Sequence, residues 1–251
     1  MSTVTYRQTF LSFLYTVMAK KIIRIIGILL LLFFTTTIAI TVIYRFVPIP
    51  GTPLMIVRAI SDDAPIHYDW TPLVKISKHL PLAVVSSEDN LFTQHNGFDF
   101  KAIREARADA EKGKKLRGAS TISQQTAKNV FLWHGRSWVR KGLEAYFTIL
   151  IETFWGKERI MEVYLNCIEM GNGIYGASAV AKHHFKKEAS KLTRKECALI
   201  AATLPNPRKY NSAKPSKYMQ KREKEILRLM QLIGKVEYSK RDEKAKNKKK
   251  Q

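Results

Sequence analysis

The residues best suited to chemistry lie in a basic block that ends in a single carboxylate. Glu144 follows a stretch with eight cations and no acid: Lys112, Lys114, Lys115, Arg117, Lys128, Arg136, Arg140 and Lys141. On a helix, cations three and four residues before a carboxylate lie beside it and keep it ionised. Such a concentration of positive charge predicts an anionic ligand. An ordinary intrahelical salt bridge is the alternative for Glu144 considered alone.

Paired amides accompany these cations. Thr121 and Gln124 match a capping box, which predicts that a helix starts there. At 100° per residue, one face of that helix carries Thr121, Gln124, Gln125, Lys128 and Asn129. An ordinary surface helix would carry charges of mixed sign. We therefore predict a ligand-binding face, with a solvated face as the alternative.

Several further elements must position this block. The spacing predicts helices over about 137–155, 157–166, 177–185, 193–204 and 215–234, and a mixture of helix and loop over 54–80. An apolar run from Pro81 brings Glu88 and Asp89 to a helix end, where acids usually cap or are solvated. Residues 101–117 read as a mobile basic segment, although a solvated helix has the same composition. GNGIYG at 171–176 matches a dinucleotide-binding pattern, but a helix precedes it instead of the required strand.

The N-terminal region contains a candidate membrane anchor. Ile25 to Tyr44 are twenty uncharged residues, enough to span a hydrocarbon core of about 30 Å. Lys20, Lys21 and Arg24 precede this run, which predicts a cytoplasmic N-terminus and a body outside. A cleaved signal peptide is the alternative, but the run is long and lacks a small-residue cleavage site. Pro48, Pro50 and Pro53 then predict a stiff stalk.

Composition narrows the class of partner. The chain of 251 residues has 43 basic and 21 acidic residues, a formal charge of +22, which favours nucleic acid or an anionic membrane. A body outside the membrane meets little nucleic acid, so we expect none as a partner. Cys167 and Cys197 read as buried thiols and not as a disulfide scaffold.

Four ordered segments carry a family resemblance. They are EDNLFTQHNGFD at 88–99, RGASTISQQTAKN at 117–129, RKGLE at 140–144 and YLNCIEMGNGIYG at 164–176. This chain resembles the peptidoglycan glycosyltransferases, most closely the monofunctional biosynthetic kind, over about 80–210. It departs from their pattern at His184, where Tyr is usual, and at Ser212, where Pro commonly follows Asn.

The resemblance implies a mostly α, lysozyme-like two-lobed domain behind one transmembrane helix. The implied organisation is a cytoplasmic N-terminus at 1–24, a span at 25–44, a stalk and membrane-proximal segment at 45–75, a glycosyltransferase domain at 76–234 and a disordered basic tail at 235–251. The enzyme would be a single-pass inner-membrane protein with a periplasmic catalytic domain. It would contribute to cell wall biogenesis and cell shape, with membrane lipids and cell-division or elongation proteins as further partners.

The resemblance also implies a reaction. The sugar 4-hydroxyl of one lipid II attacks the anomeric carbon of a growing glycan, and undecaprenyl pyrophosphate leaves with inversion. Glu88 would be the general base, and Glu144 would orient cations or a bound Mg²⁺ or other divalent ion at the leaving group. The implied substrate-binding residues are Ser120, Thr121, Gln124, Gln125, Lys128, Asn129, Arg136, Arg140 and Lys141.

Other functions fit less of the sequence. A lytic or hydrolytic muramidase of lysozyme-like fold also uses carboxylates but needs no clamp for a diphosphate. A non-enzymatic, membrane-anchored basic protein would explain the charge but not the amides beside Lys128. A transpeptidase is excluded more firmly, because no S-x-x-K sequence occurs.

Overall fold

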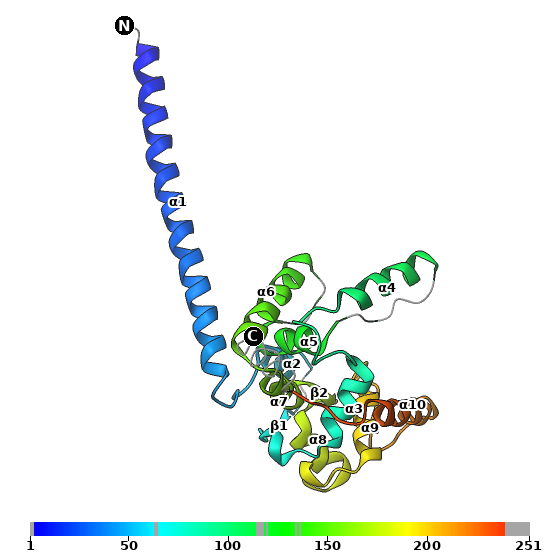
Figure 1. Cartoon of the computed structure of the whole chain (residues 1–251). Coiled ribbons are helices and arrows are strands. Elements are labelled where there is room, and N and C mark those ends of the chain that lie inside the picture. Colours follow the sequence, from blue (N-terminus) through cyan, green and yellow to red (C-terminus); the bar gives the residue numbers. More distant parts are fainter. Residues whose placement is uncertain are drawn as a thin grey trace, which may run out of the picture. The chain divides into compact units, whose positions relative to one another are not determined.

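The structure is a computed structural model that describes residues 3–62, 65–113, 118, 120–133, 135 and 137–238. It divides into two compact units, Met1–Phe46 and Val47–Gln251 (Figure 1). The predicted tail at 235–251 lies outside the described residues from position 239 onward.

The first unit is one helix, α1 (Thr3–Tyr44). Its segment Met18–Tyr44 is the one described stretch long and apolar enough to cross a membrane, as judged by length and composition. The helix begins well before the apolar run predicted at 25–44 because no glycine or proline interrupts the residues before it. Two segments that the sequence predicts separately, an N-terminus at 1–24 and a span at 25–44, thus share one helix.

The second unit is predominantly helical. Its longer helices are α2 (Pro53–Asp62), α3 (His79–Glu88), α4 (Phe100–Glu111), α5 (Ile122–Phe131), α6 (Trp138–Phe154), α7 (Lys157–Cys167), α8 (Gly176–Phe185), α9 (Arg194–Thr203) and α10 (Lys217–Ile233), with 3-10 turns η1 (Leu73–Lys75) and η2 (Ala189–Lys191). The capping box expected at Thr121 is present, and a second one forms at Thr193 with Glu196. Ser137 and Ser216 cap α6 and α10.

A small sheet joins distant parts of the second unit. Its strands β1 (His67–Tyr68), β2 (Glu169–Gly171) and β3 (Ile174–Tyr175) lie in the order β1-β3-β2. β1 runs parallel to β3, and β2 is antiparallel to it. The sequence does not predict these strands, since two or three residues are too few to show alternation. The GNGIYG stretch is thus a hairpin, and Gly176 (φ 81°) is required there because a Cβ would lie 2.4 Å from the Asn166 carbonyl oxygen.

Two groups of helices form the core. α3, α9 and α10 pack together, and α5 packs against α6 and α7. Residues Cys197–Thr203 of α9 are all buried, so this helix lies at the centre of the core. Cys167 and Cys197 are buried free thiols, as expected. The two departures from the family pattern meet each other: His184 Nδ1 lies 2.7 Å from Ser212 Oγ in a hydrogen bond.

Helix α4 corrects one expectation. Residues 100–111 form a helix, whereas the sequence favoured a mobile segment over 101–117; residues 114–117 lie outside the described part. Local interactions explain the helix, since Asp99 caps Ala102 N and Arg107 pairs with Glu111 one turn later. α4 has no buried residue and projects from the second unit (Figure 1).

Candidate active site

Glu88 ends α3 and borders a cavity. Its Oε2 accepts a hydrogen bond from Gln125 Nε2 at 3.0 Å, and Ser87 Oγ lies 3.5 Å from Oε1. Burial raises the pKa of Glu88, while the Gln125 hydrogen bond and the positive charge of Arg222 oppose that rise. The result is a partly buried carboxyl group of increased basicity that can accept or deliver a proton.

Gln125 is itself held in one orientation. Tyr164 donates from its hydroxyl to Gln125 Oε1 at 3.0 Å. Burial raises the pKa of Tyr164 well above its ordinary value, so the hydroxyl stays protonated and remains a donor. Because the amide oxygen is occupied by Tyr164, the amide nitrogen faces Glu88. A chain of hydrogen bonds from α7 through α5 thus reaches the carboxylate on α3.

Asp89 ties the end of α3 to the start of α5. Its carboxylate accepts from Ile122 N at 3.0 Å and contacts His95 Nε2 at 3.0 Å. His95 Nδ1 accepts from Gly97 N at 3.1 Å. The proton of the ring therefore lies on Nε2, which donates to Asp89. His95 has the structural environment expected of a lone histidine.

The basic cluster gathers around Glu144. We use this name for Lys128, Arg140 and Lys141. Glu144 is buried and accepts from Arg140 Nη1 at 2.8 Å and from Lys141 Nζ. The pKa of Lys128 is lowered, chiefly by burial. The positive charges of Arg140 and Lys141 lower it further, whereas the carboxylates of Glu144 and Glu88 raise it. Lys128 is therefore within electrostatic reach of both carboxylates.

The remaining predicted ligands differ in their surroundings. Thr121 accepts from Gln124 N and donates to the Gly97 carbonyl, while Gln124 Oε1 accepts from Thr121 N. Asn129 Nδ2 donates to the Gln125 carbonyl at 2.7 Å. These three side chains are buried and engaged with backbone groups, whereas Ser120 is exposed and lines the cavity. Arg136 lies outside the described residues.

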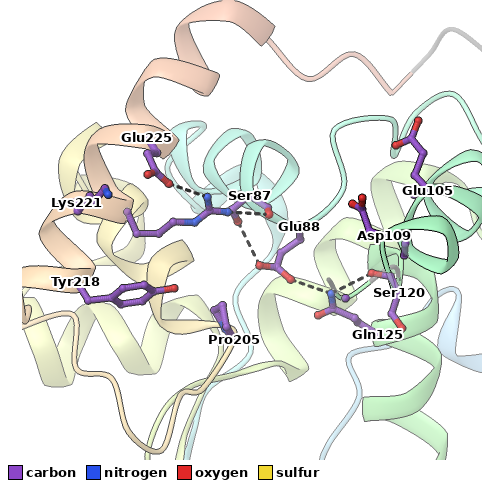
Figure 2. Close-up of a pocket in the computed structure, with 14 residues that line it drawn as sticks. Ser87, Glu88, Glu105, Asp109, Ser120, Gln125, Pro205, Tyr218, Lys221 and Glu225 are labelled. Atoms are coloured by element: carbon purple, nitrogen blue, oxygen red, sulfur yellow. Dashed lines mark hydrogen bonds and ion pairs between the residues drawn. The ribbon is translucent and has the colours of Figure 1, made fainter. Parts of the chain in front are cut away.

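The cavity is a cleft of about 790 Å³. Figure 2 shows Tyr218, Lys221 and Glu225 of α10 on one side and Glu105 and Asp109 of α4 on the other. A second cavity of about 330 Å³ adjoins it, and both are lined by Ser87, Glu88, Ala102, Gly118, Ser120 and Arg222. Glu88 thus faces a cleft whose volume lies within the range of small-molecule binding sites.

Comparisons with known proteins identify the domain. A family model described as transglycosylase matches residues 56–231. The chain is 60% identical over 221 residues to the biosynthetic peptidoglycan transglycosylase of Bacteroides thetaiotaomicron, covering 86% of this chain and 89% of that protein. It is 52% identical over 213 residues to the protein of the same name from Caulobacter vibrioides, covering 83% and 93%. For the protein of that name from Pseudomonas entomophila the values are 47% over 226 residues, 88% and 96%.

The chain belongs to the transglycosylase family. The transglycosylase domain is lysozyme-like, so the predicted mostly α, lysozyme-like fold behind one N-terminal apolar helix is confirmed. The matched range contains the described site residues from Glu88 to Glu144 and extends into α10.

The candidate site includes residues that sequence reasoning missed. Arg222 donates to Glu225 Oε2 at 3.0 Å, and its Nη2 lies 3.5 Å from the Ser87 carbonyl oxygen. Its positive charge lowers the pKa of Glu88. Its helix was predicted from an apolar stripe, which carries no information about its polar face. Tyr164 falls inside a quoted motif, but only the fold shows that it contacts Gln125.

A resident divalent cation finds no suitable donors here. The carboxylate of Glu144 is occupied by Arg140 and Lys141. Within the described ranges, no group of three histidine, cysteine or acidic side chains could hold a metal ion.

Proposed function

We propose that this transglycosylase polymerises lipid II into the glycan strands of peptidoglycan. The names of its relatives support the substrate class. The observation that carries the proposal is the position of Lys128 on α5, one turn after Gln125, which donates to Glu88, and within electrostatic reach of the Arg140–Glu144–Lys141 group. A transfer from a diphosphate donor needs this combination of a base and an adjacent clamp.

Glu88 acts as the general base. Its carboxylate accepts the proton of the acceptor 4-hydroxyl as that oxygen attacks the anomeric carbon of the growing glycan. The bond from this carbon to the diphosphate oxygen breaks, the bonding electrons leave with undecaprenyl pyrophosphate, and the anomeric configuration inverts. Burial supports this role, because a raised pKa makes the ionised carboxylate a stronger base. Gln125 holds one oxygen and leaves the other for the substrate.

The basic cluster and Arg136 bind the leaving diphosphate. Negative charge grows on this group as the bond breaks, and preorganised cations stabilise it without rearranging. Burial of Lys128 disfavours its charged form, so a bound diphosphate would stabilise the ammonium group by supplying opposite charge. Glu144 orients Arg140 and Lys141 by accepting from both.

The other predicted ligands divide into two groups. Ser120 and Gln125 line the cleft, and we assign them contacts with sugar or phosphate oxygens. Asn129 supports Gln125 by donating to its backbone carbonyl oxygen. Thr121 and Gln124 hold the start of α5 through their capping box, and we assign them a positioning role. That start carries Gln125 and Lys128, so its geometry governs both.

The proposed location is the inner membrane, with the segment Met18–Tyr44 as a single-pass anchor. Lys20, Lys21 and Arg24 favour a cytoplasmic N-terminus and a periplasmic catalytic domain. Division or elongation proteins are the expected recruiting partners. Protease added to intact spheroplasts should digest the domain, and survival of the whole chain would reverse the orientation.

Labelled lipid II tests the reaction. The parent chain should yield glycan polymer, and Glu88→Gln should fold yet lose about 10²- to 10⁴-fold in rate, the typical worth of a general base. Glu88→Asp should also lose most activity, since a shorter side chain misses its reach. Glu188→Gln, at an exposed acid that does not line the cleft, is the matched control.

Circular dichroism confirms folding of each variant. Polymer formation at the parent rate by folded Glu88→Gln would refute the mechanism. A separate incubation with finished peptidoglycan covers the muramidase alternative: release of soluble sugar fragments by the parent chain, without synthesis from lipid II, would replace the proposed function.

A further inference from the structure

Helix α10 brings to the cleft an aromatic side chain that the mechanism does not use. Tyr218 lines the cleft of about 790 Å³ and keeps 54% of its surface exposed. Its ring stacks on that of Tyr210, with centroids 5.4 Å apart and planes inclined by 24°. We call these two residues the tyrosine platform.

The platform is built and not merely exposed. Tyr210 is half-buried in the loop after α9, where its N–H donates to the Asn206 carbonyl at 3.0 Å. One face of the Tyr218 ring packs on Tyr210, which fixes the ring plane and leaves other ring surface to the cleft. Figure 2 shows the hydroxyl of Tyr218 directed toward Pro205 and the side of the cleft that holds Glu88.

The chemistry of this surface suits a sugar. A pyranose ring has an apolar face of C–H groups and a rim of hydroxyls, and tyrosine combines an apolar ring with a polar tip. Lys221 on the same helix and Glu105 across the cleft on α4 supply charged groups for the rim. A lipid tail would need an apolar groove, and a diphosphate would find Glu105 and Asp109 in the same cleft.

We propose that the tyrosine platform binds a saccharide unit of the growing glycan strand. This inference rests on the proposed function. Glu88 borders the cleft, and Gln125, which donates to Glu88, lies one turn before Lys128 on α5. We therefore place the basic cluster on the α5 side of Glu88 and the platform on the α10 side. With the diphosphate at the cluster and the reacting carbon at Glu88, the sugars of the donor strand continue along the cleft toward Tyr218.

The test uses a probe that the enzyme has no means to polymerise: a peptide-free tetrasaccharide of alternating N-acetylglucosamine and N-acetylmuramic acid. Its binding to the full-length chain in detergent is followed by isothermal titration calorimetry. Tyr218→Ala should weaken the affinity at least about fivefold, and Tyr218→Phe, which keeps the ring, should stay within about twofold. Lys224→Ala, an exposed α10 residue outside the cleft lining, is the matched control.

Equal affinity of the parent and a folded Tyr218→Ala variant would overturn the platform. A disaccharide probe decides which substrate sits there. If it binds as tightly as the tetrasaccharide and loses as much in Tyr218→Ala, the site holds a single lipid II and the assignment to the strand is wrong. The binding assay contains no lipid II, so its results do not depend on catalysis by Glu88. If Glu88→Gln loses polymerisation but Tyr218→Ala binds the tetrasaccharide like the parent, only the platform is refuted and the proposed function stands.

Discussion

Removing the hydroxyl of Tyr164 should change the pH dependence of an enzyme in which that residue touches no substrate. The hydroxyl donates to Gln125 Oε1, and the amide nitrogen of Gln125 donates to Glu88 Oε2, both at 3.0 Å. In Tyr164→Phe the amide is free to rotate and its donor leaves the carboxylate for part of the time. In Gln125→Ala the donor is lost completely. The two variants thus form a graded series.

The magnitude follows from one hydrogen bond. A bond to a charged group contributes about 1.5–3 kcal/mol, and a pKa unit corresponds to about 1.36 kcal/mol. The Gln125 bond lowers the pKa of Glu88, so its complete loss should raise that pKa and cost the ionised carboxylate about 1.5–3 kcal/mol of stabilisation. Tyr164→Phe should produce a fraction of this shift. A base works only when ionised, so the acid limb of the rate profile should move to higher pH in both variants.

Initial rates of lipid II polymerisation, measured from about pH 4.5 to 8.5, give the limb directly. Tyr68→Phe is the matched control, because its hydroxyl donates to the Ile49 carbonyl and not to Gln125. Circular dichroism of each variant establishes that the fold is kept. An acid limb that stays in place in Gln125→Ala, or moves to lower pH, would refute the role of this hydrogen bond.

Two further predictions concern the same site. Burial raises the pKa of Glu88 in the folded state, so ionisation begins to cost the fold free energy as the pH rises through the unfolded pKa, and the cost is complete above the folded pKa. Well below the unfolded pKa of about 4.3, folded and unfolded chains are both protonated and the cost is absent. Glu88→Gln should therefore melt a few degrees higher than the parent at about pH 7.5 but not at about pH 3, and a lower melting temperature at about pH 7.5 would contradict this. Lys128→Met should lower kcat/KM for lipid II about 10²- to 10³-fold. Arg140→Lys should retain only part of the parent value, because lysine lacks the two-pronged guanidinium contact with a phosphate. Parent-like kinetics in Lys128→Met, measured beside the exposed control Lys191→Met, would remove Lys128 from the clamp.

Much of the helical structure follows from local signals. The capping boxes at Thr121 and Thr193, the proline that opens α2 and the glycine that ends α10 act through neighbouring backbone groups. Such groups lie within one helical turn, so the residue order specifies them directly. The pairing of Glu144 with Arg140 and Lys141 is predictable for the same reason, being an i, i+3 and i, i+4 arrangement on one helix.

Local signals also have a definite limit in this chain. The helix at 100–111 and the three short strands were not predicted, because a solvated helix lacks an apolar stripe and two-residue strands lack a period. The same limit applies to α1, whose start depends on the absence of helix breakers and not on the edge of the apolar run.

What the sequence alone determined is the set of chemical groups and the helices that carry them: Glu88 at a helix end, and amides and cations along the next faces. Only the tertiary structure decided which groups meet. Gln125 reaches Glu88 across 37 positions, Tyr164 reaches Gln125 across 39, and Arg222 reaches the Ser87 carbonyl across 135. These contacts depend on α10 packing against α3 and on α5 packing against α7, and the apolar stripes that bury those helices contain no record of which polar side chains the packing brings together.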